Sequence, residues 1–91
     1  MIAYDGANEM LSEYLLAALE SAHYEIIDDV EPFYGTIPVL KGLWSTGPTL
    51  EACRRNLAAA LEDWILFSLT RGVDLPEIGG AVLPRPERVA V

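Results

Sequence analysis

Apolar and small residues recur at helical spacing through the stretch from Thr49 to Gly72. The residues that share this face are Leu50, Cys53, Leu57, Ala60, Leu61, Trp64 and Ser68. Thr49 follows Pro48 and occupies the position of an N-cap, and Gly72 can adopt the left-handed conformation that ends a helix. The pattern therefore predicts one long helix over residues 49–71.

A second amphipathic stretch lies near the N-terminus. Its apolar and small positions are Met10, Leu11, Tyr14, Leu15, Ala18, Leu19 and Ala22, and the glutamates fall elsewhere on the helical wheel. We expect a helix over residues 8–21. A single amphipathic helix of this length is not stable alone, so it must pack against another element.

Between the two helices the chain changes to short β-branched and aromatic runs. Residues 24–28, 33–37 and 43–46 read as three strands of an antiparallel meander over 23–46. Gly35, inside the second strand, suggests a bulge or a close backbone approach. After Gly72, the run 73–78 predicts a short edge strand broken by Pro76.

The expected fold class is α+β. It comprises a three-stranded antiparallel meander backed by a long helix, with an extra N-terminal helix and a short strand after the long helix. These elements form a single domain over residues 1–80, and residues 81–91 are predicted to form an extended C-terminal tail, because prolines interrupt them.

Charge is distributed very unevenly along the chain. Residues 1–40 contain eight acidic residues and no Lys or Arg, whereas residues 41–91 contain six of each sign, so the net charge of −8 lies in the first part. This argues against direct nucleic-acid binding and favours a basic protein partner. Solubility alone is an equally good explanation. The candidate partner-binding residues are Glu25, Asp28, Asp29 and Glu31.

Few residues are available for catalysis. His23 and Cys53 are the only histidine and cysteine, whereas a zinc site needs three or four such ligands. Cys53 is expected to be a small buried residue. We therefore predict no catalytic residue, no metal and no cofactor. The enzymatic alternative is a metal-dependent nuclease that uses a set of four acids with Mg²⁺: Asp28, Asp29, Glu31 and Asp63.

The end of the long helix is apolar on nearly all sides. A chain of 91 residues of which 52% are hydrophobic has too small an interior for all of these groups, so we expect a homodimer or a tetramer. The candidate interface residues are Ile65, Leu66, Phe67, Leu69, Leu75 and Ile78. No apolar run reaches the ~18 residues of a membrane span, and with a single cysteine and no leader pattern a cytoplasmic location is expected.

Several short motifs occur in a distinctive order. They are Tyr24-Glu25, Phe33-Tyr34-Gly35-Thr36-Ile37-Pro38, Gly42-Leu43-Trp44, Gly47-Pro48-Thr49-Leu50-Glu51-Ala52-Cys53, Asn56-Leu57 and Ala60-Leu61-Glu62-Asp63-Trp64. In this order, over about residues 23–80, the chain resembles the HicB-like antitoxin family of type II toxin-antitoxin systems.

The resemblance implies a partial ribonuclease H-like fold and assembly as dimers or tetramers. It also implies a partner, a small basic HicA-like toxin that cleaves messenger RNA and whose active site the antitoxin covers. Many members carry a DNA-binding domain after the helix, and the stand-alone form is expected here. The expected function is thus a non-catalytic interaction protein; the alternatives are the nuclease-like enzyme and an oligomeric scaffold without a toxin.

Overall fold

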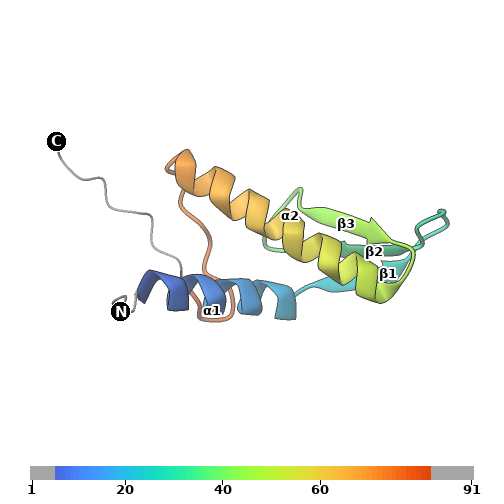
Figure 1. Cartoon of the computed structure of the whole chain (residues 1–91), viewed down its shortest axis with the longest axis horizontal. Helices are drawn as coiled ribbons and strands as arrows, with labels where there is room; N and C mark the ends of the chain where they lie inside the picture. The colour runs from blue at the N-terminus through green and yellow to red at the C-terminus, as the bar shows by residue number, and fades with distance from the viewer. Residues whose placement is uncertain (1–5, 83–91) are drawn as a thin grey trace, which may run out of the picture.

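The computed structural model describes residues 6–82, with side chains from Leu11 onward. In chain order the elements are α1 (Gly6–Glu20), β1 (His23–Ile26), β2 (Phe33–Thr36), β3 (Trp44–Gly47) and α2 (Leu50–Thr70) (Figure 1). This is a small α+β fold with the predicted order of helix, three strands and long helix. The bounds differ from the predicted ones by a few residues at most.

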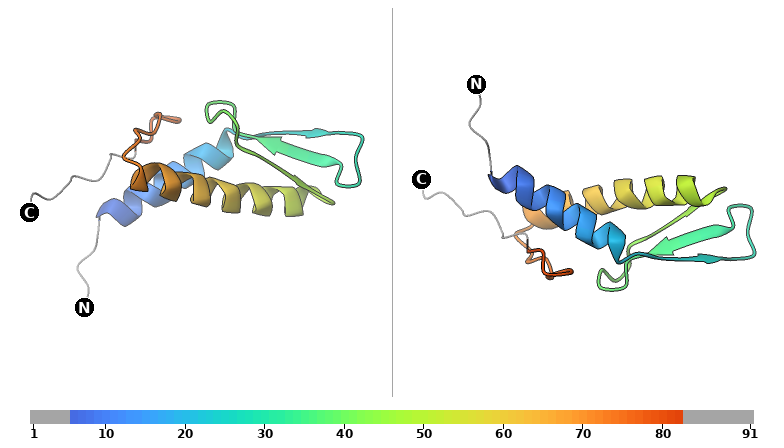
Figure 2. Two further views of the ribbon diagram at one scale, coloured as in Figure 1. Left: turned by 90° about the horizontal axis from the view of Figure 1, so that it is seen from above. Right: turned by 90° about the horizontal axis from the view of Figure 1, so that it is seen from below.

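The three strands form one antiparallel sheet in the order β1-β2-β3. Helix α2 packs against β3 and β2 on one side, and α1 continues from the end of the sheet toward the C-terminal half of α2. Figure 2 shows the sheet from two directions with α2 on one side and no described element on the other. The sheet therefore has an inner face, toward α2, and an outer face.

Small residues on the inner face allow α2 to approach closely. A Cβ atom added to Gly47 would lie 2.5 Å from the backbone nitrogen of Cys53, and one added to Gly35 would lie 2.8 Å from the ring of Tyr24. Gly35 is tightly surrounded, but by the side chains of Tyr24 and Cys53 and within a regular ladder, so it is neither a bulge nor a close approach of two backbones. The tighter contact is at Gly47, where backbone meets backbone.

Both ends of α2 follow the sequence signals. The hydroxyl of Thr49 accepts a hydrogen bond from the backbone N–H of Ala52 at 3.0 Å, and Gly72 has a φ of +71° just past the helix. The buried residues of α2 are Cys53, Leu57, Leu61, Ile65 and Ser68. Leu50, expected on the buried face, is 39% exposed at the first position of the helix.

The core lies between α1, α2 and the loop that follows β2. Its buried members are Tyr14, Ala18, Ile37, Leu40, Leu43, Leu57, Leu61, Ile65 and Ile78. The hydroxyl of Tyr14 donates a hydrogen bond of 2.6 Å to the carbonyl of Pro76. Burial raises the pKa of the Tyr14 phenol, because the charged form would lose hydration.

The predicted edge strand after the long helix is wrong. Residues 73–78 have no strand partner within the described chain and instead form a return segment that runs from α2 across to α1. Pro76 has no N–H for a ladder, and its carbonyl is taken by Tyr14. The segment ends in a tight turn: Ile78 and Ala81 exchange both backbone hydrogen bonds across Gly79 and Gly80, which have φ values of +55° and +82°.

Residues 83–91 of the predicted tail lie outside the described residues. No helix within residues 6–82 is long and apolar enough to span a bilayer.

Candidate protein-binding face

The four candidate acids lie along β1 and in the turn that joins it to β2. Glu25 is exposed on β1, and Asp28, Asp29 and Glu31 belong to the turn, which a 2.7 Å hydrogen bond from Ile27 N–H to the Pro32 carbonyl closes. Figure 1 shows this turn projecting beyond the sheet, at the end remote from both chain termini. The structure thus gathers the acids at one end of the hairpin, where any partner could reach them.

Strand register places Glu25 on the outer face. Gly35 points its Cα hydrogens toward Cys53 on the inner face, so its neighbour Tyr34 points outward. Glu25 is paired with Tyr34, and Tyr34 with Thr46 on β3. The Thr46 hydroxyl donates a hydrogen bond of 2.6 Å to a carboxylate oxygen of Glu31. One row across the sheet therefore has a carboxylate on each side of the Tyr34 ring.

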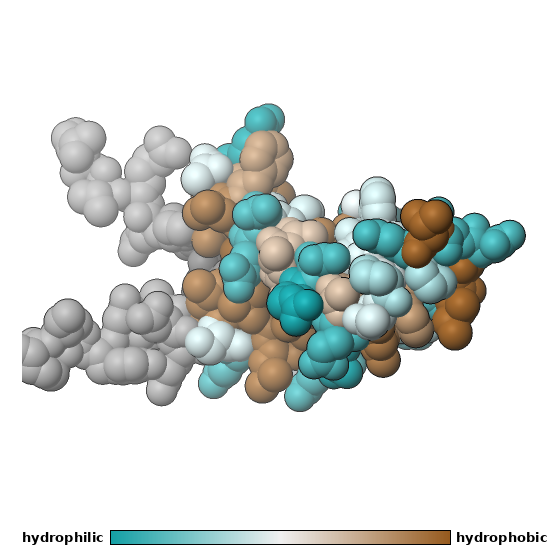
Figure 3. Space-filling view, turned by 45° about the vertical axis from the view of Figure 1, so that its right-hand side comes forward, coloured by the Kyte–Doolittle hydropathy of each residue, from teal (hydrophilic) through white to brown (hydrophobic). Residues whose placement is uncertain are grey.

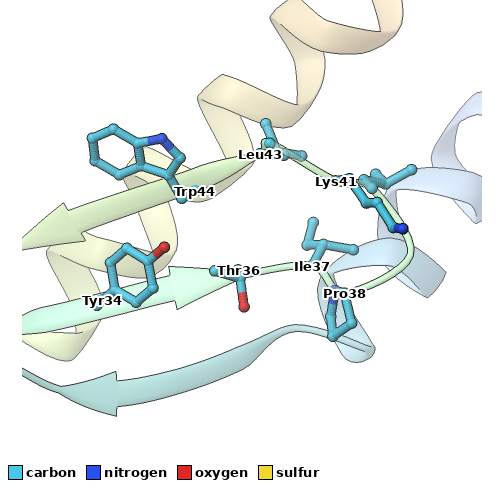
Figure 4. A pocket seen from close by; sticks show the side chains of 9 residues that line it. Tyr34, Thr36, Ile37, Pro38, Lys41, Leu43 and Trp44 are labelled. Carbon is cyan, nitrogen blue, oxygen red and sulfur yellow. The ribbon is translucent and has the colours of Figure 1, made fainter.

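The neighbouring ring on the outer face belongs to Trp44. The ring centroids of Tyr34 and Trp44 are 6.2 Å apart with an interplanar angle of 27°, a stacked pair on adjacent strands. Trp44 remains 56% exposed. Figure 4 shows the two rings side by side, next to a hollow of about 160 Å³ that extends along the β2–β3 loop toward Lys41. We call Tyr34, Trp44, Glu25, Glu31 and Thr46 the outer-face row.

The structure separates His23 and Cys53, the only histidine and cysteine of the chain. Cys53 is buried under the inner face, where the Ser45 hydroxyl lies 3.5 Å from its sulfur and donates a hydrogen bond of 2.9 Å to its carbonyl. His23 is exposed and pairs with Thr36, a position on the outer face. The sheet lies between them, so they cannot form a dyad. The prediction that Cys53 is a small buried residue is confirmed.

The acids of the nuclease alternative do not converge. Asp28 and Asp29 lie in the hairpin turn, whereas Asp63 is 13 residues after the start of α2, or about 20 Å along its axis. Within the described residues, no three side chains of His, Cys, Asp or Glu form a group that could hold a metal ion. The structure therefore offers this alternative no metal-binding geometry.

The candidate interface residues divide into two groups. Ile65 and Ile78 are each only 3% exposed and belong to the chain's own core. They were proposed as interface residues because the chain has more apolar surface than it can bury, and these two side chains are buried within the chain itself. Leu69 and Leu75 are half-buried against that core. Leu66 and Phe67 are 63% and 60% exposed.

A second hollow, of about 290 Å³, lies between the helices. Its lining is apolar except for one carboxylate: Leu11, Leu15, Glu62, Ile65, Leu66 and Leu69. Hydrophobic surface also gathers over the ends of the two helices in Figure 3. We call this hollow the interhelical groove. Its lining includes Leu66, an apolar side chain that no described residue covers.

Sequence reasoning identified the acids but not the aromatic pair between them. Tyr34 and Trp44 were each visible as strand residues, and strand alternation could have placed each on one face. Their contact depends on the register between β2 and β3, which pairs Trp44 with Thr36 and Tyr34 with Thr46. No residue-level pattern in the sequence fixes that register.

Together, the fold and the outer-face row define a small α+β protein that leaves one sheet face open. A family model described as UPF0150-like matches residues 13–76. The chain belongs to the UPF0150-like family. This family is related to the HicB-like antitoxins, so the expected resemblance is confirmed at this broader level.

One solved structure supports both the fold and the relationship. The crystal structure of TTHA0281 from Thermus thermophilus is 51% identical in sequence, with a TM-score of 0.78, and the match covers 80% of this chain and 96% of that chain. No curated protein matches the sequence.

Proposed function

We propose that the protein is a non-catalytic interaction protein, a HicB-like antitoxin or a module derived from one. It would bind and block a small basic, messenger-RNA-cleaving toxin of the HicA-like kind in the cytoplasm. The observation that carries the proposal is the outer face of the sheet, which no described element covers and which has carboxylates on both sides of half-buried Tyr34, next to exposed Trp44.

Electrostatics supports a basic partner. Glu25, Asp28 and Asp29 are solvent-exposed and Glu31 is half-buried, and no Lys or Arg occurs in residues 1–40 to neutralise them. Exposed charges of this kind raise the rate of association with an oppositely charged surface and make that rate dependent on salt. A toxin that binds RNA must present cationic groups. The same cationic surface of the toxin could therefore bind either RNA or this acidic protein.

Membership in the UPF0150-like family agrees with this proposal, since the family is related to antitoxins. The Thermus thermophilus protein, 51% identical in sequence, shares this fold with a TM-score of 0.78.

The antitoxin function is tested by co-expression. Each short reading frame adjoining the gene whose product is basic would be expressed alone and together with this chain. We expect one product to arrest growth, the chain to restore it, and the two proteins to co-elute on size exclusion. The absence of any growth-arresting neighbour, or arrest that persists despite expression of the chain, would count against the antitoxin function.

A matched pair of variants tests the acids in that same complex. Asp28→Lys with Glu31→Lys should slow association and flatten its salt dependence, because rim charges act mainly on the on-rate. Glu13→Lys with Glu20→Lys makes the same change of charge on α1 and serves as the control. Equal on-rates for the two double variants would show that total charge, rather than the hairpin turn, governs association.

Self-association is the second part of the proposal. The interhelical groove leaves Leu66 exposed beside half-buried Leu69, and a second copy of the chain would cover both in a homodimer or a tetramer. Sedimentation equilibrium at micromolar concentration should therefore give more than the protomer mass of 10.0 kDa. Leu66→Glu should yield monomers that stay folded, because Leu66 is 63% exposed in the single chain. A wild-type 10.0 kDa species would contradict self-association.

The groove also supports the scaffold alternative, an oligomer without a toxin. That alternative predicts self-association together with a failure of the co-expression test, so the two experiments separate it from the antitoxin.

A further inference from the structure

The outer-face row combines three chemical groups that recur wherever proteins recognise arginine. An aromatic surface is supplied by Tyr34 and Trp44, whose rings stack on each other with their centroids 6.2 Å apart. Glu25, on β1, is the cross-strand partner of Tyr34. The Cβ atoms of such partners are usually about 5 Å apart. On the other side, Glu31 is held by the hydroxyl of Thr46.

Two of the chain's arginines stack on other rings, and the cation that shares a hollow with Tyr34 and Trp44 is a lysine, Lys41. Within the described residues, Arg54 lies over the ring of Tyr24 at 6.0 Å and Arg71 over the ring of Phe67 at 5.1 Å. The rings of Tyr34 and Trp44 stack on each other. Guanidinium groups therefore stack on rings elsewhere in this fold. In the described part of the chain, no guanidinium lies over Tyr34 or Trp44.

The charges of the face select the class of ligand. A nucleic-acid base could stack on Trp44, but its phosphates would face Glu25, Glu31 and the turn acids. A basic protein surface meets the same carboxylates with attraction. Complementarity of charge therefore favours a protein cation over a base at the same rings.

We propose that the outer-face row is a seat for an arginine side chain presented by a basic protein partner. The guanidinium would stack on Tyr34 and Trp44 and donate hydrogen bonds to Glu25 and Glu31. This deepens the proposed function, on which it rests for the existence of the partner. Arginine is favoured over lysine because its planar group can stack and bind a carboxylate at the same time, whereas an ammonium group is compact and strongly hydrated.

The experiment uses short peptides as probes, so it does not depend on identifying the partner. A Gly-Arg repeat peptide, a matched Gly-Lys repeat peptide and a single-stranded RNA oligomer would be titrated into the ¹⁵N-labelled full chain at low and physiological salt. We expect the arginine peptide to bind about fivefold more tightly than the lysine peptide. It should also shift the indole N–H signal of Trp44, and ring currents should move the arginine side-chain protons upfield.

Three variants locate the binding. Trp44→Leu should reduce affinity for the arginine peptide about fivefold and bring it close to that of the lysine peptide. Glu25→Gln with Glu31→Gln should weaken both peptides and flatten the salt dependence. Val73→Ala removes an exposed apolar side chain beyond α2 and should change nothing. Thermal unfolding of each variant verifies that the fold is retained, and the wild-type shifts remain diagnostic if one variant fails to fold.

Two outcomes of the titrations would overturn the arginine seat. Equal affinities for the two peptides without a shift of the Trp44 signal would show attraction by bulk charge alone. Binding of the RNA oligomer with a shift of the Trp44 signal would show that the rings bind bases.

If the arginine peptide binds but no neighbour toxin is neutralised, the seat stands and the antitoxin function fails. If a toxin is neutralised equally by Trp44→Leu, the function stands and the seat fails.

Discussion

The two faces of the same three-stranded sheet have opposite character. The inner face carries Gly35, Ser45 and Gly47, which bring α2 so close that a methyl group added at Gly47 would collide with its backbone. The outer face carries Trp44, which is 56% exposed, and Tyr34, which is half-buried, and no described element packs on this face. Alternation along a strand allows this, since consecutive residues serve different faces. The difference indicates that one face maintains the fold and the other is available for a partner.

Gly47→Ala is the strongest test of the inner face. The new Cβ would lie 2.5 Å from the backbone nitrogen and 2.9 Å from the Cα of Cys53, so α2 would have to move. We expect a loss of about 3 kcal/mol in the free energy of unfolding, at the upper end for overpacking, measured by urea denaturation. Gly35→Ala should cost less, because its nearest neighbour is the Tyr24 ring, which can rotate away. A larger loss for Gly35→Ala would contradict this order.

Adjacent positions on β3 allow a matched comparison of the two faces. Ser45→Ala removes a buried hydrogen bond of 2.9 Å to the Cys53 carbonyl and should cost about 1 kcal/mol. Thr46→Val removes the partly buried bond to Glu31 on the outer face and should cost about half as much, since water can replace it. Chemical denaturation of both variants checks the comparison, and equal losses would show that the outer face also contributes to the fold.

Alkaline pH should weaken the fold through the buried tyrosines. Burial raises the pKa of Tyr24, an effect that Arg54 partly offsets, and burial also raises the pKa of Tyr14. The unfolded chain then loses its phenol protons before the folded chain does, so stability is retained below about pH 10 and falls as the pH rises beyond it. Tyr24→Phe should reduce this fall in thermal melts recorded between neutral and alkaline pH; an unchanged fall would exclude Tyr24 as its source.

The smallest expected effect is at the outer face itself. Trp44→Leu should change the free energy of unfolding by no more than about 0.5 kcal/mol, because Trp44 is 56% exposed and lies outside the core. Thermal or urea unfolding measures it. A loss comparable to that of Gly47→Ala would mean that the aromatic pair maintains the fold, and the contrast between the two faces would disappear.

Local signals were sufficient to predict the helices. Thr49 and Gly72 fixed the ends of α2 because capping depends on residues within a few positions of each other. Short strands were located for the same reason, from β-branched and aromatic residues between turn-forming ones. The hairpin acids were identified because charge is visible without any fold.

The features that sequence reasoning missed all depend on distant contacts. Ile65 reads as part of an apolar helix end, and only the approach of α1 and the β2–β3 loop shows that it is buried. Pro76 correctly indicated that residues 73–78 do not form a regular strand. The path that this segment takes instead depends on its hydrogen bond with Tyr14, which is 62 residues away. The pairing of Tyr34 with Trp44 required the strand register.

The hydrogen bond from Tyr14 to Pro76 also bears on how the molecule opens. It joins α1 to the return segment near opposite ends of the chain, whereas the sheet and the start of α2 are linked by short connections. Contacts between distant segments carry a larger loop-closure entropy, so α1 and the return segment are expected to detach together at lower free energy than global unfolding. Such a partial opening would expose the apolar lining of the interhelical groove while the outer face stays assembled. The outer face would then stay assembled during openings that make α1 and the return segment accessible to a protease.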